Sequence, residues 1–286
     1  MKFNSKNLNP FDKIYGLPFS ASAAAGAGGG GGKEDPEDYF WFKNEDTEIG
    51  YIQLKKNGYA GTLPTLTFEY STDKENWEQF TLTNTNDRKT FLNVQPGETY
   101  YIRGIGNDRL HDTNNPYERC GLQIGTTNDC KHSIGGNIMS LYDYKRMWKY
   151  TEIGDYEFAH FAASMSSNGP IIDCSELHFG NVTKIGVNSF SDMFKDQSIV
   201  KSPKLTKITE IGHLCCESMF NSCRKLQTVY APNVDVEAWT SELNNWVYDA
   251  GTNAEEPRIM YVPTQELLDL IPSGNSGYGN YTKQLL

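Results

Sequence analysis

Basic residues are the first thing this sequence has little of. Its 286 residues include 26 Lys and Arg against 36 Asp and Glu, a formal net charge of -10, and no Lys/Arg-rich run occurs. An acidic chain without a basic patch is repelled by phosphate backbones and by anionic lipid headgroups. We therefore expect neither nucleic acid nor a membrane surface among its partners.

Long apolar segments are also missing. A helix that spans a bilayer needs about 18 or more apolar residues in a row, and this sequence contains no such run. The opening MKFNSKNLNPFDKIYGLPFS is interrupted by Asn, Asp, Lys and Pro, so it lacks the apolar core of a secretory signal, and we expect it to be retained. Six cysteines in a chain of this length do not resemble a secreted disulfide scaffold. They favour buried thiols in a protein made in a reducing cytoplasm.

Patterns that carry catalysis or bind metal are not found either. One histidine and three cysteines are close in sequence, at His213, Cys215, Cys216 and Cys223. The spacing H-x-C-C-x6-C differs from that of zinc fingers and ribbons, so buried thiols are favoured over zinc. No G-x-S-x-G elbow accompanies the five histidines, and no carboxylate pair stands out for glycoside hydrolysis. We expect no enzyme, metal or cofactor, and a sugar-cleaving depolymerase is the last alternative.

The N-terminal part is predicted to be an anchor peptide, residues 1–20, followed by an Ala/Gly-rich linker, residues 21–38. Five consecutive glycines give residues 21–38 the composition of a flexible tether. Isolated hydrophobic residues and two prolines characterise the first 20 residues, which are either a disordered leader or a docking peptide for another protein. The candidate anchor residues are Phe3, Phe11, Ile14, Tyr15, Leu17 and Phe19.

Residues 39–136 are predicted to form a small antiparallel β-sandwich. Segments such as YIQL at 51–54, LTFEY at 66–70 and YYIR at 100–103 alternate with a period of two and are separated by turn formers. About six to eight strands are expected. Exposed rings of Tyr and Trp in such a sandwich either stack on sugars or serve in ordinary packing.

Residues 137–286 contain a repeated phrase, and we expect a leucine-rich-repeat domain with a C-terminal cap. TEIG at 151–154, TKIG at 183–186 and TEIG at 209–212 are 32 and 26 residues apart. Periods near 20–29 residues are typical of leucine-rich-repeat solenoids, in which each copy buries its apolar edge against the next. The predicted repeat core consists of Ile153, Ile185, Phe190, Phe194, Ile211, Phe220, Cys223 and Leu226. The fold class is therefore mainly β.

Two segments carry a family resemblance. KIGVNSF at 184–190 and MFNSCRKLQTVYAP at 219–232 resemble the BspA-like leucine-rich repeat. EYSTD at 69–73 and ETYYIRG at 98–104 look like the β-sandwich that precedes such repeats in many proteins of Bacteroides and their phages. Gln197 stands where a repeat cysteine is expected, and the first unit is longer, so the number of coils stays open.

The resemblance, together with the N-terminal peptide, implies a structural virion protein of the kind carried by crAss-like bacteriophages. We expect a head fibre or capsid decoration subunit on the outer surface of the virion, made in the host cytoplasm. Residues 1–20 would bind capsid or tail proteins, and the outer domains would contact a host-surface glycan or protein. By analogy with phage fibres we expect a homo-oligomer, a trimer. The alternative is a bacterial cell-surface leucine-rich-repeat adhesin or glycan-binding module.

Overall fold

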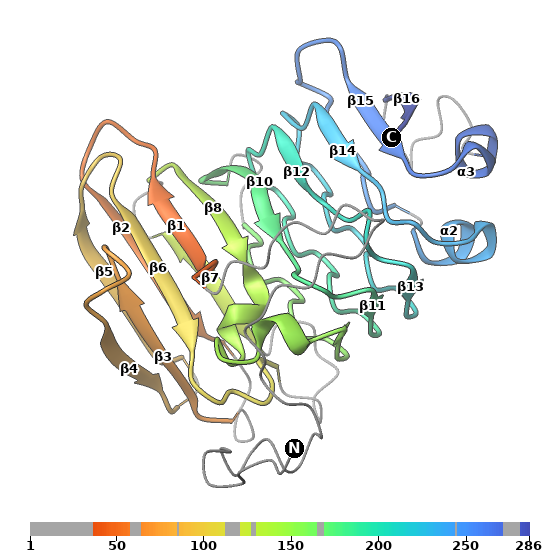
Figure 1. Ribbon diagram of the computed structural model, residues 1–286. Coiled ribbons are helices and arrows are strands. Elements are labelled where there is room, and N and C mark those ends of the chain that lie inside the picture. The colour runs from red at the N-terminus through yellow and green to blue at the C-terminus, as the bar shows by residue number, and fades with distance from the viewer. Residues whose placement is uncertain are drawn as a thin grey trace, which may run out of the picture. The chain divides into compact units, whose positions relative to one another are not determined.

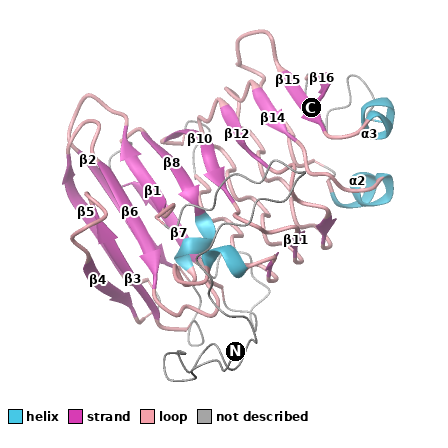
Figure 2. Cartoon of the chain, in the orientation of Figure 1, coloured by secondary structure: helices cyan, strands magenta, loops and turns pink. Residues whose placement is uncertain are grey.

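The structure is a computed structural model, and it describes residues 37–57, 64–84, 86–111, 121–126, 130–164, 169–243, 245–270 and 281–286. The predicted anchor residues, and all of the linker except its last two residues, lie outside these ranges. The described residues belong to one compact unit. Strands dominate it, as expected for a mainly β chain (Figure 2).

A six-stranded sheet forms the first layer. Its strands are β1 (Phe40–Asn44), β3 (Leu66–Ser71), β4 (Glu78–Leu82), β6 (Thr99–Gly104), β8 (His132–Asn137) and β10 (Ile171–His178). They are ordered β10-β8-β1-β6-β3-β4, and every neighbouring pair is antiparallel except β8 and β10. Alternate residues of β1 are buried, so one face of this sheet is apolar and the other faces outward.

A three-stranded antiparallel sheet covers the apolar face. It consists of β5 (Arg88–Val94), β2 (Gly50–Lys56) and β7 (Leu122–Thr126), in that order. Phe42 on β1 packs edge to face on Phe91 of β5, with ring centroids 5.0 Å apart. Lys56 also points inward, and its ammonium donates hydrogen bonds to the carbonyls of Thr83 at 2.6 Å and Leu82 at 3.5 Å, which offset part of the cost of its burial. We call these two layers the sandwich.

The repeated phrases form a separate parallel sheet. β9 (Glu152–Ile153), β11 (Lys184–Ile185) and β13 (Glu210–Ile211) lie in the order β13-β11-β9. The turns after each strand are also stacked, because amides of one copy donate to carbonyls of the next. Phe158 donates to Ser189 at 3.0 Å, and Phe190 donates to Cys215 at 2.7 Å. The sequence repeats because each copy pairs with the following one.

A second parallel sheet is built from the other side of the repeats. It contains β12 (Lys201–Lys204), β14 (Thr228–Tyr230), β15 (Ile259–Val262) and β16 (Thr282–Leu285), in chain order. The amide of Val200, just before β12, donates to Ile172 of β10 at 3.3 Å. Because β10 also pairs with β8, the row of strands passes from the sandwich into the repeats (Figure 1).

Left-handed backbone positions reveal a further copy of the turns. Ten non-glycine residues of the repeats have positive φ, and their spacing follows the repeats: Tyr156, His160, Asn188, Asp192, Asp196, Leu214, Ser218, Ser222, Asn245 and Asp249. The amide of Phe220 donates to the carbonyl of Trp246 at 2.8 Å, which continues the series of hydrogen bonds between one set of turns and the next. Four sets of turns are therefore stacked, one more than the sequence repeats indicate.

Short helices complete the described chain. α2 (Val236–Glu242) begins after Asp235, whose carboxylate accepts the amide of Ala238 at 2.8 Å, as a helix N-cap does. α3 (Gln265–Leu270) follows β15, while η2 (Ile138–Leu141) and η3 (Met147–Lys149) are 3-10 turns between the sandwich and the repeats. None of the described helices is long and apolar enough to cross a membrane.

All but one of the residues predicted as the repeat core are buried. Ile153, Ile185, Phe190, Phe194, Phe220, Cys223 and Leu226 are buried, while Ile211 is only half-buried. Ile211 lies on β13, at the edge of its sheet, where no further described strand covers it. Gln197 stands where a repeat cysteine is expected. Its Oε1 atom accepts the amide of Ile171 at 2.9 Å, and its Nε2 atom donates to the carbonyl of Ala162.

Candidate functional site

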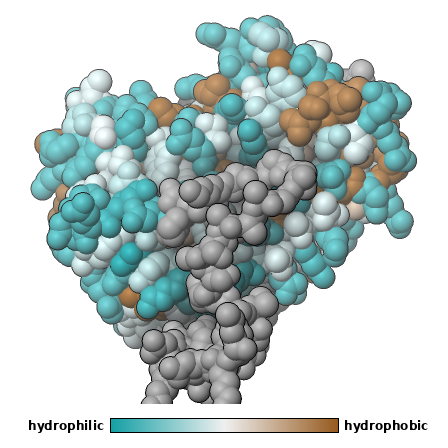
Figure 3. Space-filling view, viewed as in Figure 1, coloured by the Kyte–Doolittle hydropathy of each residue, from teal (hydrophilic) through white to brown (hydrophobic). Residues whose placement is uncertain are grey.

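The outward face of the six-stranded sheet carries the candidate site. In β1, Trp41 and Lys43 alternate with buried phenylalanines and therefore point away from the core. Cross-strand pairing places Tyr101 opposite Trp41 and Thr99 opposite Lys43 on β6, and Ser133 opposite Lys43 on β8. On the side shown in Figure 3, the visible surface of the sandwich is mostly hydrophilic, whereas hydrophobic side chains gather toward β14 and β15.

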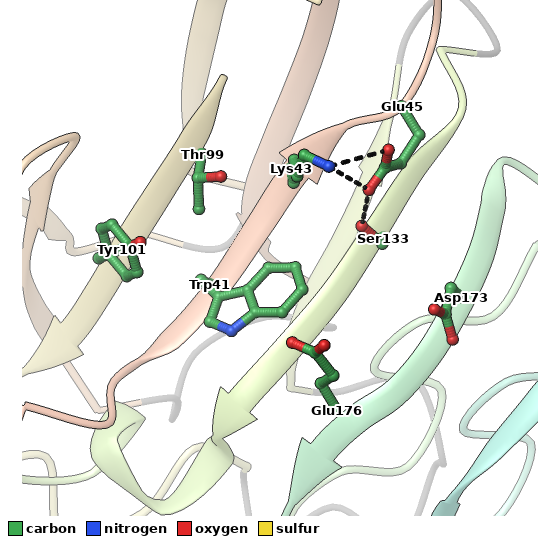
Figure 4. Close-up of a pocket in the computed structure, with 8 residues that line it drawn as sticks. All are labelled: Trp41, Lys43, Glu45, Thr99, Tyr101, Ser133, Asp173 and Glu176. Atoms are coloured by element: carbon green, nitrogen blue, oxygen red, sulfur yellow. Dashed lines mark hydrogen bonds and ion pairs between the residues drawn. The ribbon is translucent and has the colours of Figure 1, made fainter. Parts of the chain in front are cut away.

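A depression of about 320 Å³ lies on this face. Four strands of the large sheet and the turn after β1 contribute to it, and its lining residues are Trp41, Lys43, Glu45, Thr99, Tyr101, Ser133, Asp173 and Glu176. Small-molecule sites usually enclose about 300–1,000 Å³, so this one is at the small end of that range. Figure 4 shows the indole of Trp41 in the middle, with the carboxylate of Glu176 pointing toward it.

Gly135 sets the position of the Trp41 ring. A Cβ atom at Gly135 would lie 2.2 Å from Cζ2 and 2.5 Å from Cε2 of the indole, distances at which atoms overlap. The indole therefore lies directly over the backbone of β8, where only glycine leaves room for it. Its other side forms part of the pocket wall. Trp41 is a half-buried platform whose position is fixed by its neighbour strand.

One ion pair closes the upper part of the pocket. The ammonium of Lys43 lies 3.0 Å from Oε1 of Glu45, and the hydroxyl of Ser133 donates to the same oxygen at 2.6 Å. Desolvation alone would raise the pKa of Glu45, but the hydrogen bonds from Ser133 and Lys43 outweigh it and lower the pKa below its usual value. Glu45 is thus a charged acceptor and not a proton donor.

Two carboxylates of β10 line the opposite wall. Oδ1 of Asp173 accepts the amide of Ser175 at 2.8 Å, which leaves Oδ2 without a partner among the described residues. The carboxylate of Glu176 is exposed and makes no hydrogen bond to any described residue. The half-buried Thr99 hydroxyl and Trp41 indole N–H also make no hydrogen bond to any described residue. The pocket therefore combines a flat ring with several free donors and acceptors.

A rigid stack of side chains borders the pocket along the same face. The guanidinium carbon of Arg103 lies 3.7 Å from the ring centroid of Trp77 and 4.0 Å from that of Tyr144. Its Nε atom is 2.7 Å from Oε2 of Glu69. The ammonium of Lys74 lies 4.8 Å from the centroid of Tyr101 and occupies one side of that ring. These contacts stiffen the sheet face beside the pocket.

The residues that invited a zinc interpretation do not meet at one point. His213 faces Glu242, with Nδ1 at 3.1 Å from Oε2, and Cys223 donates its thiol to the carbonyl of Phe194 at 2.9 Å. Cys215 and Cys216 contact each other, with Sγ atoms 3.3 Å apart. Within the residues that the structure describes, no group of three or more His, Cys, Asp or Glu side chains could hold a metal ion.

The described cysteines are buried thiols. All five, Cys130, Cys174, Cys215, Cys216 and Cys223, are free and buried, and Cys120 lies outside the described residues. Burial raises the pKa of Cys174 and Cys223, while a hydrogen bond with Cys216 and burial raise that of Cys215. A thiol with a raised pKa is a poor nucleophile and metal ligand, because the thiolate is the reactive form.

Asp73, in the EYSTD segment at 69–73, lies in the turn between β3 and β4. The carboxylate of Asp73 accepts the amides of Asn76 and Glu75, each at 2.8 Å. These hydrogen bonds, with that of Asn76 first, hold the pKa of Asp73 well below its usual value. The turn also presents Trp77 to the stack around Arg103, so its role is structural.

Sequence reasoning did not single out the pocket residues. The alternation FWFKN at 40–44 indicates that Trp41 points outward. Asp173 and Glu176 lie more than 100 residues further along the chain, so no local pattern links them to Trp41. Comparison of the chain with protein-family models, curated proteins and solved structures gives no match. The function is therefore inferred from the site and from the sequence patterns.

Proposed function

We propose that this chain is a non-enzymatic structural virion protein of a bacteriophage, a head fibre or capsid decoration subunit that contacts the host surface. Residues 1–20 bind capsid or tail proteins, residues 21–38 act as a tether, and the described unit is displayed outward. The BspA-like resemblance stated above supports the assignment. In this proposal the stacked repeats are a short leucine-rich-repeat solenoid capped by the sandwich.

The observation that carries the proposal is the open pocket on the outward face of the large sheet. It offers a fixed Trp41 ring and unpaired polar groups, which is the chemistry of a binding site and not of a packed core. The parallel strands that continue from β8 through β10 toward β12 support a rigid unit, which presents this face in one orientation. Many tethered copies raise the effective concentration, so weak single contacts suffice for attachment.

Particle incorporation tests the anchor. The full chain and a chain lacking residues 2–20 are each added to phage particles that lack the protein, and the amount that sediments with the particles is measured. We expect incorporation of the full chain only. Equal incorporation of both chains, or of neither, contradicts the anchor and favours a bacterial cell-surface adhesin.

Cell binding tests the display function. The full chain, labelled with a fluorophore, is mixed with Bacteroides cells, and the bound fraction is measured with and without excess unlabelled protein. We expect saturable binding that Trp41→Ala weakens and that Tyr248→Ala, a change at an exposed ring in the repeats, leaves unchanged. Binding that does not saturate contradicts a role in host contact.

A further inference from the structure

We infer that the pocket on the large sheet binds a neutral, hydroxyl-rich saccharide unit, with a sugar ring on Trp41 and its hydroxyls on Glu176 and Asp173. This inference rests on the proposed function and names the chemical class of its ligand. It is carried by the shape of the Trp41 platform, the charge of the pocket and the free polar groups around it.

The platform suits the apolar face of a sugar ring. Gly135 lets the indole lie over β8, so the ring is held in place before any ligand arrives. A pyranose presents C–H groups on its faces and hydroxyl groups around its edge, and a flat aromatic ring packs against the C–H face. Preorganisation of this kind lowers the entropy cost of binding.

The charge of the pocket favours neutral over acidic sugars. Three carboxylates and one ammonium line it, a formal net charge of -2. The ammonium of Lys43 already pairs with Glu45 at 3.0 Å. The ammonium of Lys74 lies 4.8 Å from the ring centroid of Tyr101, but the lining residues themselves offer no further cation. A uronic acid, sialic acid or sulfated sugar is therefore disfavoured relative to a neutral sugar.

The free polar groups match the edge of a neutral sugar. Glu176 and the Oδ2 atom of Asp173 are acceptors without partners among the described residues, and sugar hydroxyls are donors. Hydrogen bonds to carboxylates are stronger than those between neutral groups. The Trp41 N–H and the Thr99 hydroxyl add a donor and a group that can both donate and accept. The pocket volume of about 320 Å³ suits a small saccharide unit.

Affinity electrophoresis of the full chain tests the inference. Native gels contain galactomannan, xyloglucan or yeast mannan as neutral probes, or alginate as the anionic probe, at a series of concentrations. We expect at least one neutral probe to retard the wild-type protein and alginate to leave its mobility unchanged. Retardation by alginate alone, or by none of the four, overturns the inference.

Three variants locate the site, and one serves as control. Trp41→Ala removes the platform and Gly135→Ala displaces it, so each should weaken binding at least about tenfold. Glu176→Ala changes an exposed side chain that the fold does not need, and we expect a loss of about tenfold from the missing charged hydrogen bond. Tyr248→Ala alters an exposed ring outside the pocket and should bind like the wild type. Thermal unfolding curves verify that each variant is folded.

The outcomes separate this inference from the proposed function. If the wild type binds a neutral probe but Glu176→Ala and the folded Trp41 variant bind equally well, the pocket is not the site and the inference fails. If the wild type binds Bacteroides cells but no neutral probe, the saccharide class is wrong while the display function stands. If neutral probes bind and the pocket variants do not, the inference is supported whatever the particle experiment shows.

Discussion

Three glycines at the end of the repeated phrase provide the sharpest test of the stacked repeats. A Cβ atom at Gly186 would lie 2.5 Å from Oδ1 and 2.8 Å from the backbone N of Asp155. At Gly212 it would lie 2.7 Å from the carbonyl carbon of Gly186. At Gly154, in the first copy, the nearest atoms are 3.5 Å away on Glu157, an ordinary contact.

These distances predict different costs for the same substitution to Ala. The clashing atoms at Gly186 and Gly212 include backbone, which can move only if neighbouring copies separate and the hydrogen bond from Gly186 to Ile153, at 2.8 Å, lengthens. Overpacking of this kind costs about 1–3 kcal/mol of unfolding free energy. Gly154→Ala meets no clash, so it should be neutral or stabilise by up to about 1 kcal/mol by restricting the unfolded chain.

Urea unfolding followed by far-UV circular dichroism measures the effect. We expect the midpoints of Gly186→Ala and Gly212→Ala to fall and that of Gly154→Ala to stay at or above the wild-type value. None of the three glycines has positive φ, so backbone strain does not confuse the comparison. The reasoning is contradicted if all three variants unfold at the same urea concentration, or if Gly154→Ala is the least stable. In either case Gly186 and Gly212 are not needed for close packing of one copy on the next.

Three further predictions concern buried groups. Burial raises the pKa of Glu157 from 4.5 to about 7, so between these pH values the folded form keeps the proton that the unfolded form loses. The free energy of unfolding should therefore fall by about 3 kcal/mol as pH rises from about 4.5 to about 7. Glu157→Gln removes this loss, and a difference in unfolding free energy that does not change with pH would contradict the reasoning. Burial lowers the pKa of His132 from 6.5 to about 4, so the free energy of unfolding should fall by about 3 kcal/mol as pH falls from about 6.5 to about 4. In the same pH titration, His132→Gln should remove this pH dependence. Phe220 is fully buried and stacked on Phe194, with ring centroids 5.6 Å apart, so Phe220→Ala should lower the free energy of unfolding by about 3–5 kcal/mol. A decrease below about 1 kcal/mol in urea unfolding would contradict a core role for this pair of rings.

The repeat was readable from the sequence because its contacts recur at the same residue types. Ile185 and its neighbour Gly186 pack against the previous copy in the same way as Ile211 and Gly212, so the same letters recur. The fourth set of turns was not readable, because it shares the backbone geometry and not the phrase. There Asn245 and Asp249 take the left-handed positions, after α2 in place of a strand.

Period-two alternation over residues 39–106 predicted strands and, with them, which side chains point away from the core. Trp41 points outward for this reason alone, since its neighbours in β1 are buried. Alternation specifies a face but not the strand that lies beside it. The antiparallel register of β1 and β8 places Gly135 next to Trp41, and the missing side chain of Gly135 leaves room for the indole. Alternation along β1 alone does not predict this neighbour.

The sequence by itself determined the mainly β class, the stacking phrase and most of the buried repeat residues, because these follow from local periodicity. Only the tertiary structure decided that β10, a strand of the repeat region, joins the edge of the sandwich sheet. That pairing brings Asp173 and Glu176 to Trp41 across more than 100 residues of chain. No local pattern encodes such a meeting, since it is set by the free energy of packing two distant segments side by side.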